Sequence, residues 1–149
     1  MSRLARLFPA RQPDPLVDVV LLLARVVVGV VFIAHGLQKL DQGHAATAAG
    51  FEAMGIPLAE VAAAYAIAAE IGGGALLLAG LLSPLAGVVI ALTMAGAFWF
   101  AHRGTAVLSQ EGGWEMVAVY AVAALVLGAM PGRLSVDHAL FGRRSQATA

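Results

Sequence analysis

Residues 16–40 read LVDVVLLLARVVVGVVFIAHGLQKL, and this stretch decides the class of the fold. A helix of about 20 predominantly apolar residues, rising about 1.5 Å per residue, spans the hydrocarbon core of a bilayer. The stretch is longer than this and carries few charges, so it predicts a transmembrane helix. It also exceeds the apolar region of about 7–15 residues found in secretory signal peptides, and we therefore expect it to be retained.

The composition of the whole chain indicates a membrane protein as well. Of its 149 residues, 60% are hydrophobic and 12% are charged, whereas soluble domains carry about 25% charged residues. The net charge is zero and no basic stripe is present, so nucleic acid is not an expected partner. Cysteine is absent, which excludes disulfides, iron–sulfur clusters and thiolate zinc sites.

Three further apolar stretches predict three more membrane helices, at residues 58–82, 85–101 and 114–130. Proline bars a helix from continuing through it, so Ser83-Pro84 predicts a tight turn and Pro131-Gly132 ends the last helix. We therefore expect an all-α fold, in which an antiparallel four-helix bundle forms a single transmembrane domain. A linker at residues 41–57 and a polar loop at residues 102–113 connect the helices.

Lysine and arginine predict how the bundle sits in the membrane. Six arginines lie in the tails at residues 1–15 and 131–149, whereas the opposite side carries only Lys39 and Arg103. The positive-inside rule then places both tails in the cytoplasm. We expect residues 3–8 either to lie on the inner leaflet or to be disordered, and Ser135 to cap a short surface helix that ends near Phe141.

Two charged residues lie deep within the predicted spans. A charge at the centre of a membrane helix costs roughly 2.5–3.5 kcal/mol on insertion scales, so such residues are usually paired. Arg25 lies about 13 Å and Glu70 about 18 Å from the cytoplasmic ends of adjacent antiparallel spans, taking about 1.5 Å per residue. We predict an Arg25–Glu70 ion pair, which either fixes the helix register or serves a ligand site.

Small residues surround Glu70 at helical spacing: Ala62, Ala66 and Gly74 recur every fourth residue about it. Such ladders usually form packing seams between membrane helices. The alternative is that the ladder leaves a gap for a flat ligand.

Polar and aromatic residues gather where the predicted spans end on the outer side: His35, Lys39, His102, Trp114 and Glu115. One interpretation is an ordinary interfacial belt. The other is a ligand site, because a quinone needs hydrogen-bond donors for two carbonyl oxygens, a proton route and an apolar groove. His35, Arg25, Trp99 and Trp114 can donate, and Glu70 and Glu115 can relay protons. A bis-histidine haem between His35 and His102 is less favoured because no other signature supports it, and a His/Glu metal site is less favoured because the spacing matches no standard ligand set.

An ordered set of motifs along nearly the whole chain resembles the DoxX family. The set comprises Arg25-x3-Gly29-x2-Phe32-x2-His35-Gly36-x2-Lys39, Phe51-x2-Met54-Gly55-Ile56-Pro57, Glu70-x-Gly72-Gly73, Gly80-Leu81, His102, Gly112-Gly113-Trp114-Glu115 and Pro131-Gly132-Arg133-x-Ser135-x-Asp137. The resemblance implies a four-helix protein of the bacterial inner membrane. Relatives include a membrane subunit of thiosulfate:quinone oxidoreductase, whereas many members have no known activity.

The leading hypothesis is a redox-associated membrane subunit that binds a quinone or a similar lipophilic molecule in a polar intramembrane pocket. Its candidate ligand-binding residues are Arg25, His35, Lys39, Glu70, His102, Trp114 and Glu115, with no covalently bound cofactor and no metal. Membrane lipids and an oxidoreductase protein are the expected partners. The alternative is a non-catalytic scaffold or assembly subunit for such a complex. A transporter is less favoured because no inverted repeat is visible. The sequence decides neither whether the chain is itself an enzyme nor its oligomeric state.

Overall fold

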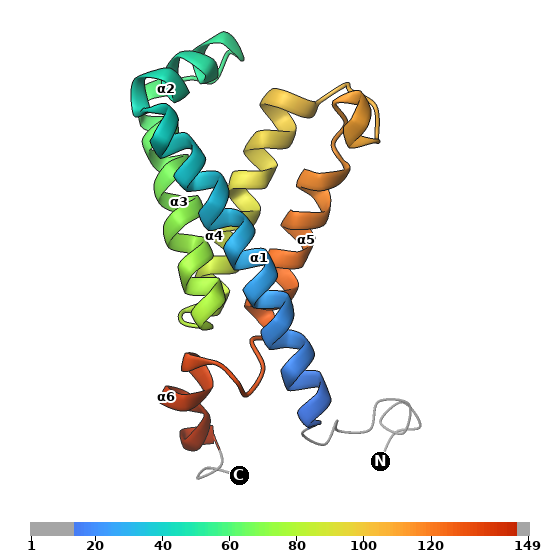
Figure 1. Ribbon diagram of the computed structural model, residues 1–149. Coiled ribbons are helices and arrows are strands. Elements are labelled where there is room, and N and C mark those ends of the chain that lie inside the picture. The colour runs from blue at the N-terminus through green and yellow to red at the C-terminus, as the bar shows by residue number, and fades with distance from the viewer. Residues whose placement is uncertain (1–13, 146–149) are drawn as a thin grey trace.

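The computed structural model describes residues 14–145, and within them the chain is helical and contains no strand (Figure 1). The predicted all-α class is therefore confirmed, while residues 3–8 lie outside the described part. The elements are α1 (Pro15–Gln42), α2 (His44–Ala53), α3 (Ala59–Ala79), α4 (Ser83–Ala97), the π-helical turn η2 (Phe98–His102), the 3-10 turn η3 (Ser109–Glu111), α5 (Glu115–Ala129) and α6 (Val136–Ser145).

Three of these helical segments are long and apolar enough to cross a membrane: α1, α3, and α4 continued through η2. Their outward faces are apolar as well. On α1, Val20, Leu23, Val27 and Val30 follow one helical stripe and are each at least half exposed, whereas soluble proteins rarely expose contiguous apolar surface of this kind. Helix α5 is apolar but has 15 residues, which corresponds to about 22 Å.

Residues 41–57, predicted only as a linker between the first two spans, are largely helical. Gly43 breaks the chain direction with φ of 91°, and α2 starts directly after it. The alanine-rich sequence of α2 has a high helix propensity, but the glycines and polar residues next to it made this signal hard to recognise in the sequence. The Thr47 hydroxyl donates to the Lys39 carbonyl at 3.2 Å, which holds α2 against the end of α1.

Glycines bring the long helices together in two pairs. A Cβ on Gly29 of α1 would lie 2.8 Å from the Gly74 carbonyl oxygen of α3. A Cβ on Gly87 of α4 would lie 3.0 Å from Gly128 of α5. Of the small-residue ladder of α3, Gly74 therefore packs against α1, whereas Ala62 and Ala66 line a cavity between the helix pairs.

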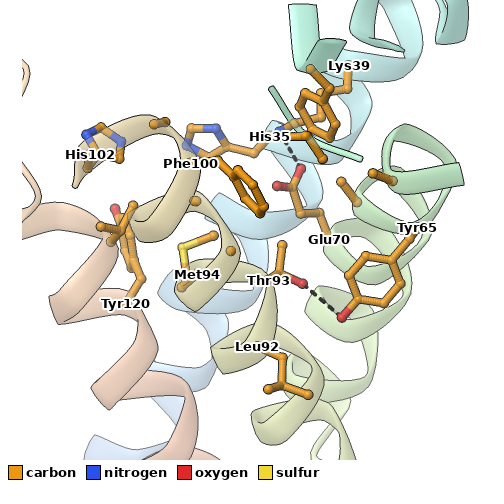
Figure 2. A pocket seen from close by; sticks show the side chains of 18 of the residues that line it. His35, Lys39, Tyr65, Glu70, Leu92, Thr93, Met94, Phe100, His102 and Tyr120 are labelled. Atoms are coloured by element: carbon orange, nitrogen blue, oxygen red, sulfur yellow. Dashed lines mark hydrogen bonds and ion pairs between the residues drawn. The ribbon is translucent and has the colours of Figure 1, made fainter. Parts of the chain in front are cut away.

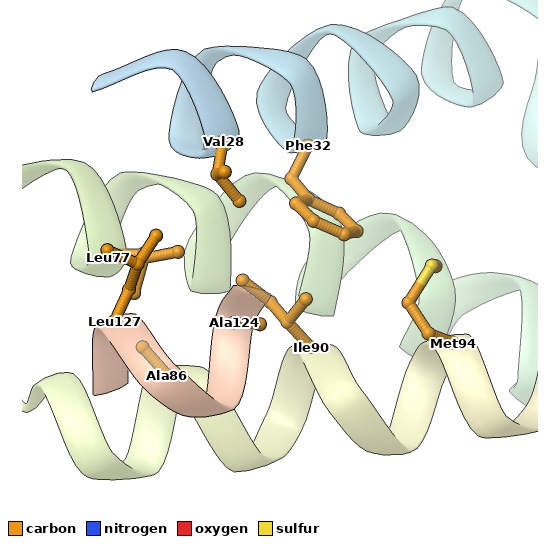
Figure 3. Close-up of a cluster of buried hydrophobic side chains, with 8 residues drawn as sticks. All are labelled: Val28, Phe32, Leu77, Ala86, Ile90, Met94, Ala124 and Leu127. Carbon is orange, nitrogen blue, oxygen red and sulfur yellow. The ribbon is translucent and has the colours of Figure 1, made fainter. Parts of the chain in front are cut away.

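The core lies where the two helix pairs meet (Figure 3). Eight buried apolar side chains form it: Val28, Phe32, Leu77, Ala86, Ile90, Met94, Ala124 and Leu127. Toward the end that carries α2, the α1–α3 pair diverges from the α4–α5 pair (Figure 1). This divergence leaves room for a cavity between the pairs.

The predicted Arg25–Glu70 ion pair is wrong. Arg25 is fully buried and donates to the backbone carbonyls of Leu78, at 3.4 Å, and Leu134. Glu70 lies eight residues from Leu78, about 12 Å along α3. The prediction compared the depths of Arg25 and Glu70 by counting residues from the predicted ends of their spans. In the structure the two helices do not end at the same level, because α3 stops at Ala79 while α1 projects beyond it.

The C-terminal segment closes this end of the bundle. The Asp137 carboxylate accepts hydrogen bonds from the backbone N–H groups of Leu82 and Ser83, both at 2.8 Å, and so caps the start of α4. The turn between α3 and α4 comprises residues 80–82. Arg25 lies on the α3 side of this turn, where its positive charge faces the last carbonyls of α3. Ser135 accepts from the His138 N–H at 3.2 Å, which confirms the predicted cap, although α6 continues past Phe141.

Candidate functional site

A cavity of about 550 Å³ occupies the diverging end of the bundle (Figure 2). All four long helices line it, and Phe51 and Met54 of the α2 segment line the end near the helix tips. Most of the lining side chains are apolar. Its volume falls within the range of about 300–1,000 Å³ that is usual for small-molecule sites.

An ion pair lies at the polar end of this cavity. The Lys39 ammonium of α1 and the Glu70 carboxylate of α3 are 2.6 Å apart, and their side chains are 21% and 6% exposed. Gly36 makes this pairing possible, because a Cβ there would lie 3.1 Å from the Glu70 Cβ. A carboxylate this deeply buried needs a compensating cation, and Lys39 supplies it.

Two histidines line the same cavity from opposite helix pairs. His35 belongs to α1, one turn before Lys39, and His102 is the last residue of η2. Figure 2 shows His35, His102 and the Lys39–Glu70 pair toward the same end of the cavity. The His102 Nδ1 lies 3.0 Å from the Gly112 carbonyl oxygen. The π-helical turn that carries His102 is a distortion that often marks functional sites.

The lower wall holds polar groups that sequence reasoning missed. The Thr93 hydroxyl of α4 lies 3.4 Å from the Tyr65 hydroxyl of α3. Tyr120 of α5 lines the cavity and packs edge-on against Phe32, with ring centroids 5.6 Å apart. These side chains sit on different helices, so no spacing along the chain signals their proximity. The one local signal for these polar groups was Tyr65, an isolated tyrosine in the alanine-rich α3.

Three of the seven predicted site residues lie away from the cavity lining. Arg25 is at the other end of the bundle. Trp114 packs edge-on against Phe98, with ring centroids 6.2 Å apart. The Glu115 carboxylate accepts hydrogen bonds from the Ser109 N–H at 2.7 Å and the Ser109 hydroxyl at 2.6 Å, and so holds the connection between η3 and α5.

The remaining four predicted residues, His35, Lys39, Glu70 and His102, share the cavity. Together they present hydrogen-bond donors and an acceptor. Across residues 14–145, no group of three or more metal-ligating side chains is arranged to hold a metal ion. A largely apolar cavity with these polar groups toward one end has the features of a small-molecule site.

Comparisons with known proteins give a family match and similar sequences. The sequence model of the DoxX family matches residues 20–103. A Bacillus subtilis (strain 168) protein named "Putative oxidoreductase CatD" is 44% identical over 77 residues, 51% of this chain and 54% of the relative. The chain thus spans about half the length of that relative. "Uncharacterized membrane protein Rv3486" of Mycobacterium tuberculosis (strain ATCC 25618 / H37Rv) is 34% identical over 130 residues, 80% of each chain.

No solved structure matches the chain significantly. The family match covers more than half of the chain, and its apolar helices and its relatives agree on the membrane as its environment. The chain is a membrane protein that belongs to the DoxX family.

Proposed function

We propose that the chain crosses the bacterial inner membrane four times, with both termini in the cytoplasm. The fourth span is α5 with its flanking residues, 114–130, about 25 Å at about 1.5 Å per residue. A span slightly shorter than the bilayer core is accommodated by local thinning. Its tight packing on α4 through Gly87 and Gly128 supports a span beside a span, and the arginine-rich tails support the orientation.

Single introduced cysteines can test this topology, because the chain has no cysteine of its own that a thiol reagent would label. A membrane-impermeant thiol reagent should label Gln110→Cys in intact cells and Leu140→Cys only after the membrane is opened. Labelling of both positions from the same side would contradict the four-span arrangement.

We propose further that the cavity binds a flat lipophilic molecule with polar ring oxygens, such as a quinone. The observation that carries this is the ion pair of the buried Glu70 with the partly buried Lys39, 2.6 Å apart, at one end of an otherwise largely apolar cavity. An ammonium group has three N–H donors, so Lys39 retains donors beyond the one that faces Glu70. His35 and His102 are further partners for a carbonyl oxygen or for a proton.

In this proposal the chain is a redox-associated subunit surrounded by membrane lipids. A relative carries the word oxidoreductase in its name, and a quinone is a redox-active lipid. The chain contains no cysteine, so thiol redox chemistry is excluded and electrons would reach a quinone from a partner protein. The partner is an oxidoreductase that docks on the membrane subunit.

A glycine pair permits a sharp binding test. A Cβ on Gly96 or on Gly72 would meet no heavy atom within 4 Å, but only Gly96 lines the cavity. Gly96→Leu therefore fills the cavity, whereas Gly72→Leu adds the same side chain outside it. Lipids extracted from protein purified from its native membrane, analysed by mass spectrometry, should contain a quinone in the wild type and in Gly72→Leu, but not in Gly96→Leu.

The second candidate function is a scaffold that assembles an oxidoreductase complex. It is favoured by the internal pairing of polar groups, since Glu70 is neutralised by Lys39 and the His102 ring contacts the Gly112 carbonyl. This candidate predicts no enriched ligand and a protein that co-purifies at a fixed ratio with the wild type and with Gly96→Leu alike.

A further inference from the structure

The cavity reaches the surface of the bundle at the seam between α3 and α4. Tyr65 of α3 and Leu92 of α4 both line the cavity, yet their side chains are 47% and 61% exposed. Side chains that line a cavity and are exposed to this degree stand at its mouth. Figure 2 shows the Tyr65 side chain reaching from α3 toward Thr93 of α4. We call the mouth formed by Tyr65, Leu92 and Thr93 the α3–α4 portal.

The seam between α3 and α4 is tightly packed at one end and open at the other. A Cβ on Gly73, in the second half of α3, would lie 3.1 Å from the Ile90 side chain of α4. A Cβ on Gly96, near the end of α4, would meet no heavy atom within 4 Å, although Gly96 lines the cavity. The two helices therefore diverge along the seam, and the portal lies toward its wide end.

Apolar side chains narrow two other sides of the cavity. On the α1–α5 side, Phe32 packs edge-on against Tyr120, with ring centroids 5.6 Å apart. Near the helix tips, the half-buried Phe51 and Ile56 line the cavity. The α3–α4 seam is thus the side where the lining side chains leave the most direct way out.

Only weak polar contacts bridge the portal. The Tyr65 hydroxyl lies 3.4 Å from the Thr93 hydroxyl and 3.5 Å from the Val89 carbonyl oxygen. Hydrogen bonds between hydroxyl groups and oxygen acceptors are usually about 2.7–2.8 Å long, so both contacts are weak. The Thr93 hydroxyl has a better acceptor in the Val89 carbonyl, at 3.0 Å. The Tyr65 ring is therefore held across the seam by contacts that cost little to break.

We propose that the α3–α4 portal is the route by which the flat lipophilic ligand enters the cavity from the bilayer, with Tyr65 as the side chain that opens and closes it. Helix α3, and α4 continued through η2, are each long and apolar enough to cross a membrane. The seam between two such spans faces the hydrocarbon in which a lipophilic ligand dissolves. The inference rests on the proposed function, and it adds the route of entry and the residues that control it.

A portal controls rates and leaves affinity unchanged. A change at the portal alters the barrier between the free and the bound state, so it changes the association and dissociation rate constants by the same factor. A residue that contacts the bound ligand changes the equilibrium affinity instead. Measuring both rate constants therefore separates a portal residue from a binding residue and from a merely structural one.

Two leucines on α4 give a matched pair for this test. Leu85 lies seven residues before Leu92, on the same face of the helix, and is similarly exposed at 56%, but it does not line the cavity. Because the chain has no cysteine, full-length Leu92→Cys and Leu85→Cys can each be modified at one site with benzyl methanethiosulfonate after assembly into lipid nanodiscs. The probe is tetramethyl-1,4-benzoquinone, whose ring has no free position for thiol addition. Stopped-flow quenching of tryptophan fluorescence follows its binding and release.

The adduct on Leu92→Cys should slow association and dissociation about tenfold each and leave Kd unchanged. Removing the adduct with a reductant, which is then washed out, should restore both rates. The same adduct on Leu85→Cys should change neither rate. Tyr65→Phe, which lacks the bridging hydroxyl, should raise both rates about threefold at constant Kd.

Other outcomes overturn the portal and leave the proposed function standing. These are unchanged rates with the adduct on Leu92→Cys, equal slowing by the adducts at both positions, or a weaker affinity at an unchanged association rate. If the probe does not bind the wild type, or if Gly96→Leu binds it as well as the wild type does, the proposed function itself fails and the portal with it.

Discussion

Replacing the buried Arg25 tests how the end of the bundle near the C-terminal segment is held together. Its guanidinium donates to backbone carbonyls of Leu78 and Leu134, and its charge also acts on Asp137. Hydrogen bonds from a charged donor contribute about 1.5–3 kcal/mol each. In Arg25→Met, a side chain of similar volume replaces the arginine, so the hydrogen bonds are lost but the cost of burying a charge is removed as well. We therefore expect a net loss of about 2–4 kcal/mol in the free energy of unfolding.

A double-mutant cycle decides between the partners of Arg25. Residues in contact or in one charge network show coupling energies of about 0.5–3 kcal/mol, whereas distant residues are additive within about 0.5 kcal/mol. Arg25→Met should therefore couple with Asp137→Asn and be additive with Glu70→Gln. Unfolding is followed by far-ultraviolet circular dichroism during SDS titration in a mild detergent. Coupling above about 1 kcal/mol between Arg25 and Glu70, or additivity between Arg25 and Asp137, would refute the register described here.

Three further predictions follow from packing and charge. Gly29→Ala should destabilise the fold by about 1–3 kcal/mol in thermal unfolding, because its Cβ would lie 2.8 Å from an α3 carbonyl oxygen, while Gly72→Ala should stabilise it by up to about 1 kcal/mol; equal effects would contradict the close helix approach. Gly80 and Gly104 both have positive φ, 66° and 85°, but a Cβ on Gly80 would also meet the buried guanidinium, so alanine should lower the melting temperature more at Gly80 than at Gly104. Burial opposes the ionisation of Asp137, yet hydrogen bonds from the start of α4 hold its pKa below the ordinary value; its stabilisation is complete above about pH 4 and is lost as pH falls further. The unfolding midpoint of Asp137→Asn should accordingly lose part of the wild-type pH dependence in that range, and an unchanged dependence would contradict the assigned cap.

Local signals predicted most of the helices correctly. Helix ends at Ser83-Pro84 and Pro131-Gly132, and the cap at Ser135, depend on a few adjacent residues, and the structure places helix boundaries close to all three. The helix α2 was missed because glycine, alanine and polar residues alternate there, and alanine propensity competes with the glycine breaks.

The candidate site was predictable only in part. His35, Lys39 and His102 lie near helix ends on one side of the bundle, and even the coarse order of the spans brings these residues together. Glu70 joined them through a partner that the sequence did not indicate, Lys39. Trp114 and Glu115 are near in sequence to the same end, but their side chains serve the connection into α5.

By itself, the sequence determined the class of protein: an all-helical chain with apolar segments long enough to cross a bilayer, since hydrophobic length and helix breaks are properties of adjacent residues. The tertiary structure alone decided which charges meet. The axial register of α1 relative to α3 depends on where Gly29 and Gly36 contact α3. A difference of about two helical turns in this register changes the partner of every charged residue on the face that the two helices share. That register moved Arg25 from Glu70 to the C-terminal segment and assigned Glu70 to Lys39.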